Sequence, residues 1–198
     1  KIADLKNRHF ELIVDKSSSM DARDCPGGHS RWEASEELAA GLAQKMSELG
    51  SKGINITLFS GSKLKIYPDC TGSDVRNIFK ENEPFGGTNL ALALKNRLDD
   101  WFSKGRVKPL TIVTVTDGLP DSEQDVASVI TAATKKISAD EEIGLLFLQV
   151  GKDSKARAYL KRLDDDLEKE GARFDIVSSK TCDEIENSSL TEALLDAV

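Results

Sequence analysis

The stretch HFELIVDKSSS, residues 9–19, decides the fold of this chain. Its first six residues form a β-rich run, and the run ends at Asp15. Ser17 and Ser19 follow Asp15 at alternate positions. In open α/β sheets, ligands bind beyond the carboxyl ends of the strands. The stretch therefore predicts a strand that leads directly into a ligand-binding loop.

A helical pattern follows that loop, and a hairpin follows the helix. Residues 31–49 carry apolar side chains at steps of three and four and are closed by Gly50, which predicts a helix. Residues 54–59 and 64–67 are both β-rich, and a short SGSK segment separates them. Since a parallel crossover needs about a dozen residues or more, one strand of this pair must run antiparallel, and we expect it at an edge of the sheet.

The rest of the chain alternates helices with strands. We predict further strands at residues 110–115, 143–150 and 174–177. We predict further helices at residues 73–79, 89–102, 122–137, 154–169 and 181–198. Such alternation is typical of an α/β fold with a doubly wound, mostly parallel sheet and helices on both faces. The expected sheet has six strands in the order 3-2-1-4-5-6, with strand 3 antiparallel at the edge.

Length and charge limit the classes of partner. The 198 residues fit one domain, and no linker or repeat divides them, so we expect a single domain over residues 1–198. Lys and Arg number 27 against 34 Asp and Glu, the net charge is -7, and no basic stripe is present. No apolar stretch approaches the ~20 residues of a membrane helix. We therefore expect neither a nucleic acid nor a membrane as partner.

The cysteines indicate the redox compartment. Cys25, Cys70 and Cys182 are odd in number, widely spaced and outside any C-x-x-C motif. This pattern argues against both a disulfide framework and a thiolate zinc site. No signal segment opens the chain, although it begins at Lys1 rather than Met. We expect a reducing, cytoplasmic location.

Two further segments add oxygen donors to those of the first loop. Residues 86–89, GGTN, open a predicted helix, and residues 116–118, TDG, follow a predicted strand. Because the strand order is expected to reverse between the first and fourth strands, all three segments should meet at one rim of the sheet. The five candidate metal ligands are Asp15, Ser17, Ser19, Thr88 and Asp117.

Two carboxylates and three hydroxyls are hard donors that suit a divalent cation. Asp15 and Asp117 at about 5 Å would repel each other by roughly 3 kcal/mol at an effective dielectric constant of 20, and an intervening dication removes that cost. Mg²⁺ fits an oxygen shell that retains some water, and Mn²⁺ and Ca²⁺ are the alternatives. The sequence therefore predicts a divalent-cation site.

The order Asp-x-Ser-x-Ser, a later Thr and a later Asp resembles the metal-ion-dependent adhesion site of von Willebrand factor type A domains. All five positions match, and Lys16 occupies a variable position. The resemblance covers nearly the whole chain. It implies a binding module without enzymatic activity, in which the bound ion accepts a Glu or Asp side chain of a protein partner. The segment DGLPD, which ends at Asp121, resembles the pattern of bacterial and intracellular members, including those associated with tellurium resistance.

Each signal also has a simpler interpretation. Asp and Ser abound in loops, Thr88 could be a helix cap, and an Asp-Gly pair is a common turn. Ser18 and Met20 are interpreted as structural residues only. The loop of residues 21–31 borders the expected crevice, and it either shapes partner choice, with a contact from His29, or is a plain surface loop.

The rival function is a phosphatase-like, metal-dependent hydrolase with Asp15 as nucleophile. That chemistry generally needs a second carboxylate two residues later as the general acid, where this chain has Ser17. No G-x-S-x-G elbow, G-x-G-x-x-G turn or phosphate-binding P-loop is present. The sequence therefore favours a binding module over an enzyme.

Overall fold

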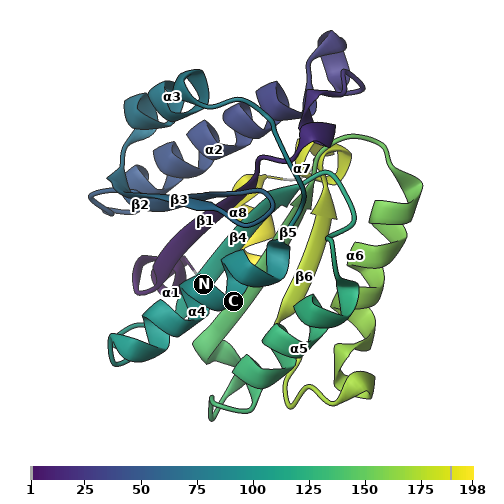
Figure 1. Cartoon of the computed structure of the whole chain (residues 1–198). Coiled ribbons are helices and arrows are strands. Elements are labelled where there is room, and N and C mark those ends of the chain that lie inside the picture. The colour runs from purple at the N-terminus through teal and green to yellow at the C-terminus, as the bar shows by residue number, and fades with distance from the viewer. Residues whose placement is uncertain (1, 188) are drawn as a thin grey trace.

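The computed structural model describes residues 2–187 and 189–198 and places a six-stranded sheet at the centre of the chain (Figure 1). The strand order is β3-β2-β1-β4-β5-β6. β3 runs antiparallel to β2, whereas the other neighbouring strands are parallel. The predicted order and the antiparallel edge strand are confirmed. The strands are β1 His9–Asp15, β2 Ile54–Phe59, β3 Leu64–Cys70, β4 Leu110–Thr116, β5 Ile143–Gln149 and β6 Val177–Thr181.

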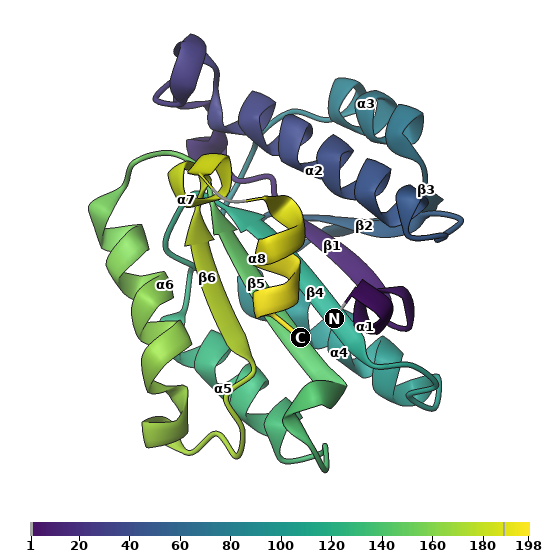
Figure 2. The same ribbon diagram turned by 180° about the vertical axis from the view of Figure 1, so that it is seen from behind.

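Helices cover both faces of the sheet, and an apolar cluster fills the space on each side (Figures 1 and 2). One face carries α1 Ile2–Lys6, α2 Arg31–Glu48, α3 Gly72–Glu81 and α8 Leu190–Asp196. The other carries α4 Leu90–Ser103, α5 Glu123–Thr134 and α6 Ser154–Asp166. Because both faces are covered, nearly every residue of β1, β4 and β5 is buried, which explains the almost continuous apolar sequence of β5 and the absence of strict apolar–polar alternation in β4.

The last strand differs from the prediction. β6 spans Val177–Thr181 and not residues 174–177. It lies at the edge of the sheet and is mostly half-buried, so it needs no apolar run. Its backbone is held in part by Asp164 of α6, which accepts a hydrogen bond from Ser179 N at 2.8 Å. The apolar pattern therefore marked the approach to the strand rather than the strand itself.

The C-terminal helix also differs from the prediction. Residues 181–198 form two helices, α7 Cys182–Asn187 and α8, and Ser189 caps the second of them with a capping box. Residue 188 of the predicted helix, like residue 1 of the predicted domain, lies outside the described residues. Capping by Ser189 starts a separate helix, which packs against the sheet (Figure 2). Within the described part of the chain, none of the helices has both the length and the apolar character needed to cross a bilayer.

The end of α8 rests on a glycine of the central sheet, and this contact generates a prediction. A Cβ atom added to Gly144 of β5 would overlap the carbonyl oxygen of Ala197. We expect Gly144→Ala to lower the free energy of unfolding by about 2 kcal/mol, because the C-terminal segment must move. Denaturant unfolding monitored by circular dichroism measures the change.

Gly72→Ala is the matched control for this substitution. Gly72 is the first residue of α3, and a Cβ atom there meets open space. Alanine at that position should leave stability unchanged or raise it by up to about 1 kcal/mol. Equal effects of the two substitutions would contradict the contact between β5 and the C-terminal segment.

Candidate metal centre

The strand order reverses between β1 and β4, and the candidate site lies at that point. The chain proceeds from β1 to β2 on one side, and β4 lies on the other side of β1. Val14 pairs with Val115, so Asp15 at the end of β1 is level with Thr116, and Asp117 follows. The structure therefore brings the first and third donor segments together at the carboxyl ends of adjacent strands.

Asp15 is fully buried and held at both carboxylate oxygens. Its Oδ1 accepts a hydrogen bond from Ser17 N at 2.8 Å, and its Oδ2 accepts one from Thr116 Oγ1 at 2.7 Å. Burial, followed by the nearby charge of Asp117, raises the pKa of Asp15 to about 7, although the hydrogen bonds from Ser17 and Thr116 lower it. An ionised carboxylate in this position is therefore unfavourable unless a cation accompanies it.

The two predicted serines lie side by side. A short 3-10 helix, Ser18–Asp21, follows Ser17, and the Oγ atoms of Ser17 and Ser19 are 3.1 Å apart. Ser17 is buried, whereas Ser19 is exposed, so the pair reaches from the buried carboxylate to the surface. Met20 is fully buried and anchors this turn in the core, which agrees with its structural interpretation.

The loop before α4 is tied to the first loop through Ser18. Gly86 N donates to Ser18 Oγ at 3.0 Å, and Ser18 N donates to the Gly86 carbonyl at 3.1 Å. Phe85 N donates to the carbonyl of Lys16 at 2.8 Å. Ser18, which the motif leaves variable, thus connects the two loops that carry the predicted hydroxyl ligands.

Asp121 holds Thr88 at the same rim. Thr88 N donates to Asp121 Oδ1 at 2.9 Å, and Asp121 N donates to the Thr88 carbonyl at 2.8 Å. A Cβ atom on Gly87 would lie 3.0 Å from Asp121 Oδ2, so glycine permits this close approach. Asn89, rather than Thr88, caps α4 by accepting from Leu92 N at 3.1 Å. The helix-cap interpretation of Thr88 is therefore wrong.

Arg31 is a residue of the site that the sequence analysis missed. Its Nη1 lies 2.9 Å from Asp117 Oδ2, and Asp117 is buried. Its Nε and Nη2 donate to the two carboxylate oxygens of Asp24 at 2.9 and 2.7 Å. The hydrogen bond from Arg31 is the main cause that lowers the pKa of Asp24 to about 2. The sequence held one signal that could have identified Arg31: it is an arginine at the first position of a predicted helix, where the helix dipole disfavours a cation.

His29, in the loop between β1 and α2, contacts the start of α2. His29 Nδ1 lies 2.9 Å from Glu33 Oε2, and both side chains are exposed. Glu33 also completes the capping box of α2 with Ser30. His29 therefore belongs to the start of the helix, and Asp24 is the residue of this loop that connects to the centre.

The donors fit a hard divalent cation. The described residues contain no group of three or more His, Cys, Asp or Glu side chains that could hold a metal, so a site here must combine its two carboxylates with hydroxyls. Asp15 and Asp117 are both buried, and the electrostatic repulsion between them is one cause of the altered pKa of Asp15. Oxygen donors of this kind suit Mg²⁺, Mn²⁺ or Ca²⁺.

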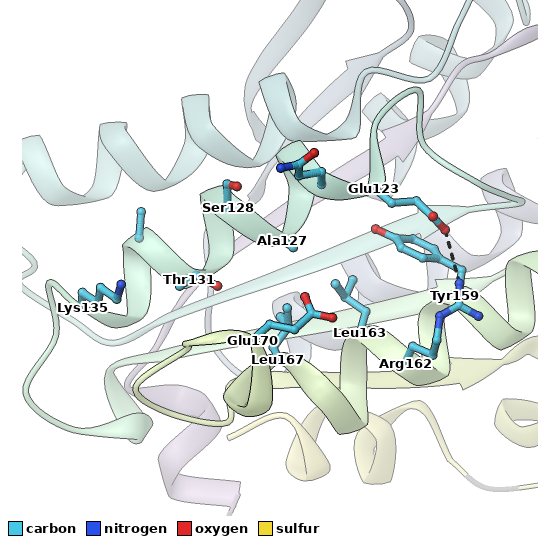
Figure 3. A pocket seen from close by; sticks show the side chains of 12 residues that line it. Glu123, Ala127, Ser128, Thr131, Lys135, Tyr159, Arg162, Leu163, Leu167 and Glu170 are labelled. Carbon is cyan, nitrogen blue, oxygen red and sulfur yellow. Dashed lines mark hydrogen bonds and ion pairs between the residues drawn. The ribbon is translucent and has the colours of Figure 1, made fainter.

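A hollow of about 600 Å³ lies elsewhere, between α5 and α6 (Figure 3). Arg162 and Glu123 form an ion pair of 3.4 Å at its wall. Among the described residues, the buried Tyr159 hydroxyl there has no hydrogen-bond partner. Size alone does not make this hollow the functional site, because the paired carboxylates and hydroxyls gather at the rim of the sheet.

Comparison with known proteins identifies the class. The sequence profile of the von Willebrand factor type A domain matches residues 11–119, which is more than half of the chain. The chain therefore belongs to the von Willebrand factor type A domain family. No curated protein matches it in sequence.

Solved structures share the fold at low sequence identity. The manganese-loaded TRAP protein of Plasmodium vivax is 17% identical with a TM-score of 0.62, over 90% of this chain and 70% of that one. A von Willebrand factor type A protein from Catenulispora acidiphila is 13% identical (TM-score 0.63; 96% of this chain, 42% of that one). The pilus adhesin SpaC of Lactobacillus rhamnosus GG is also 13% identical (TM-score 0.63; 94% and 30%). The chain thus spans less than half of the latter two proteins.

The buried carboxylate of Asp15 generates a prediction about pH. Because its pKa is raised to about 7, Asp15 contributes stability that is present below about pH 4 and is lost as pH rises through 7. In the presence of chelator at pH 8, Asp15→Asn should therefore have a free energy of unfolding about 2 kcal/mol higher than that of wild type. At pH 4 the two proteins should differ little. Urea unfolding at a series of pH values measures this.

Asp99→Asn, on the exposed surface of α4, is the control for that series. It should give a small difference from wild type that does not grow with pH. If the difference in stability between Asp15→Asn and wild type likewise did not grow with pH, the ionised Asp15 carboxylate would not destabilise the metal-free protein.

Proposed function

We propose that the chain is a metal-dependent protein-binding module that captures an acidic residue of a partner protein. The five predicted ligands would hold one divalent cation at the carboxyl end of the sheet, as a metal-ion-dependent adhesion site. The bound ion would supply an electrophile with an open coordination position, and a Glu or Asp of the partner would fill it. Mg²⁺ is the proposed ion, with Mn²⁺ or Ca²⁺ as alternatives.

One observation carries this proposal: two buried carboxylates, those of Asp15 and Asp117, end adjacent parallel strands beside a pair of serine hydroxyls. Burying two like charges together is unfavourable without a cation. The likeness to a TRAP structure described as manganese-loaded supports a divalent ion in a protein of this fold. The likeness to a pilus adhesin supports a role in binding.

The hydrolase alternative has less support. Asp15 accepts hydrogen bonds from Ser17 N and from the Thr116 hydroxyl, and neither group is a general acid at neutral pH. The side chain at position 17, where a second carboxylate would be needed, is a hydroxyl that lies against Ser19. We therefore propose a function without enzymatic activity.

We also propose a reducing, cytoplasmic location. Cys25, Cys70 and Cys182 are free thiols in the structure. Burial raises the pKa of each of them, which favours the uncharged thiol over the reactive thiolate. Membership among bacterial or intracellular proteins associated with tellurium resistance remains a prediction, as do a single domain and the exclusion of nucleic acid and membrane partners.

A metal titration tests the ion site. At ten times its dissociation constant, Mg²⁺ or Mn²⁺ should raise the free energy of unfolding of wild type by about 1.4 kcal/mol if it binds only the folded state. Asp15→Ala should show no such rise, because a central ligand is missing. A melting temperature that stays constant for wild type across a wide range of metal concentrations would argue against the site.

A peptide selection tests the proposed partner chemistry. Peptides selected from a random library in Mg²⁺ or Mn²⁺ and released by chelator should share a Glu or Asp, and replacing that residue by Gln or Asn should abolish binding. Asp117→Ala should lose this binding but remain folded, because Arg31 keeps its two hydrogen bonds to Asp24. Asp99→Ala on α4 is the matched control. Chelator-independent binding, or equal binding of the amide peptides, would contradict the proposal.

A further inference from the structure

The guanidinium of Arg31 occupies a position that bears directly on the metal centre. It donates to Asp117 Oδ2 through Nη1 and to both oxygens of Asp24 through Nε and Nη2. Its side chain is only 14% exposed. The motif that defines the candidate ligands includes neither Arg31 nor Asp24, so the role of this ion-pair chain is separate from that of the ligands.

The surroundings of Arg31 hold it in place independently of Asp117. The two-point contact with Asp24 matches the fork of the guanidinium, which restricts its orientation. On another side lies the backbone of Gly151, where φ is +80° and an added Cβ would lie 2.5 Å from Arg31 Nε. Lys152 N also donates to Asp24 Oδ2 at 3.3 Å. Asp24 therefore acts as an anchor that keeps a positive charge beside Asp117.

Arg31 also lies at a position of α2 that disfavours a positive charge. Arg31 is the first residue of α2, directly after its cap at Ser30. Positive side chains are unfavourable at a helix N-terminus, because the partial charge there is also positive. The ion pairs with two carboxylates outweigh that effect. A cation is thus maintained at a place where both the helix dipole and an incoming metal ion would repel it.

We propose that Arg31 is a built-in counter-ion that weakens the affinity of the metal centre for the ion alone, so that ion and partner carboxylate bind cooperatively. With Arg31 beside Asp117, the charges next to a bound ion would be two negative and one positive. Asp24 is 34% exposed, so water screens its charge more effectively. A carboxylate from the partner restores the missing negative charge. This inference rests on the proposed function and specifies how that site is regulated.

An alternative role for Arg31 predicts the opposite sign. If the guanidinium served mainly to orient Asp117 for the metal, its removal would weaken metal binding by about 10- to 100-fold. If Arg31 is a counter-ion, its removal strengthens metal binding. The direction of the change in affinity therefore separates the two roles.

Isothermal titration with Mn²⁺ in the absence of any partner tests the proposal. Arg31→Gln should bind Mn²⁺ at least about tenfold more tightly than wild type, because a fixed positive charge near the ion is gone. Arg31→Lys, which keeps the charge, should stay close to wild type. Arg76→Gln is the matched control, since Arg76 pairs with Glu36 and Glu37 on the outer surface of α2, and it should change nothing.

A double variant separates the effect of removing Arg31 from effects of a changed net charge and of misfolding. Arg31→Gln with Asp24→Asn has the net charge of wild type and leaves no unpaired carboxylate from the anchor. It should also bind Mn²⁺ more tightly than wild type, and circular dichroism establishes that it is folded. In both Gln variants, the gain in Mn²⁺ affinity caused by a selected acidic peptide should be smaller than in wild type.

Several outcomes would overturn the inference. Unchanged or weaker Mn²⁺ binding by folded Arg31→Gln or by the folded double variant would do so, as would tighter binding by Arg31→Lys equal to that of Arg31→Gln. In these cases wild type still binds Mn²⁺, so the proposed function survives. If wild type shows no Mn²⁺ binding in the same titration, the proposed function fails and this inference fails with it.

Discussion

One electrostatic constraint shapes the candidate site, which is the burial of two carboxylates at the ends of neighbouring strands. Asp15 and Asp117 lie where the order of the parallel strands reverses, and both are almost completely inaccessible to water. Within the protein, this charge is compensated by hydrogen bonds to Asp15 and by the guanidinium of Arg31 on Asp117. A domain of this size has enough buried apolar surface to tolerate such a cost at one rim.

The loops around these carboxylates form one connected unit. Ser18 bonds to Gly86, and Asp121 bonds to Thr88, so the loop before α4 is held from both sides. Each of these contacts joins segments that are more than thirty residues apart. Backbone hydrogen bonds from Ser18 N to the Gly86 carbonyl and from Asp121 N to the Thr88 carbonyl accompany these side-chain contacts, so each link to the Thr88 loop is double. A site assembled from three loops needs such hydrogen bonds to hold its ligands in fixed positions relative to one another.

Local patterns predicted most of the fold. β1, β4 and β5 were clear because strands covered on both faces are rich in apolar and β-branched residues. The pattern failed at β6, an edge strand whose Ser and Lys side chains are half-buried. It also failed at the break between α7 and α8, where Ser189 starts a new helix. Both errors lie where burial is partial and hydrophobic periodicity is therefore weak.

The sequence by itself determined the order of the elements, the direction of the hairpin and the rim at which the candidate ligands gather. These follow from periodicity, loop length and the position of the donors just after a strand or just before a helix, all of which are local to the chain. Only the tertiary structure decided that Arg31 pairs with Asp117, that Asp24 anchors it, and that Ser18 and Asp121 fix the Thr88 loop. Charge pairing depends on which loops meet in space, and no local pattern encodes it.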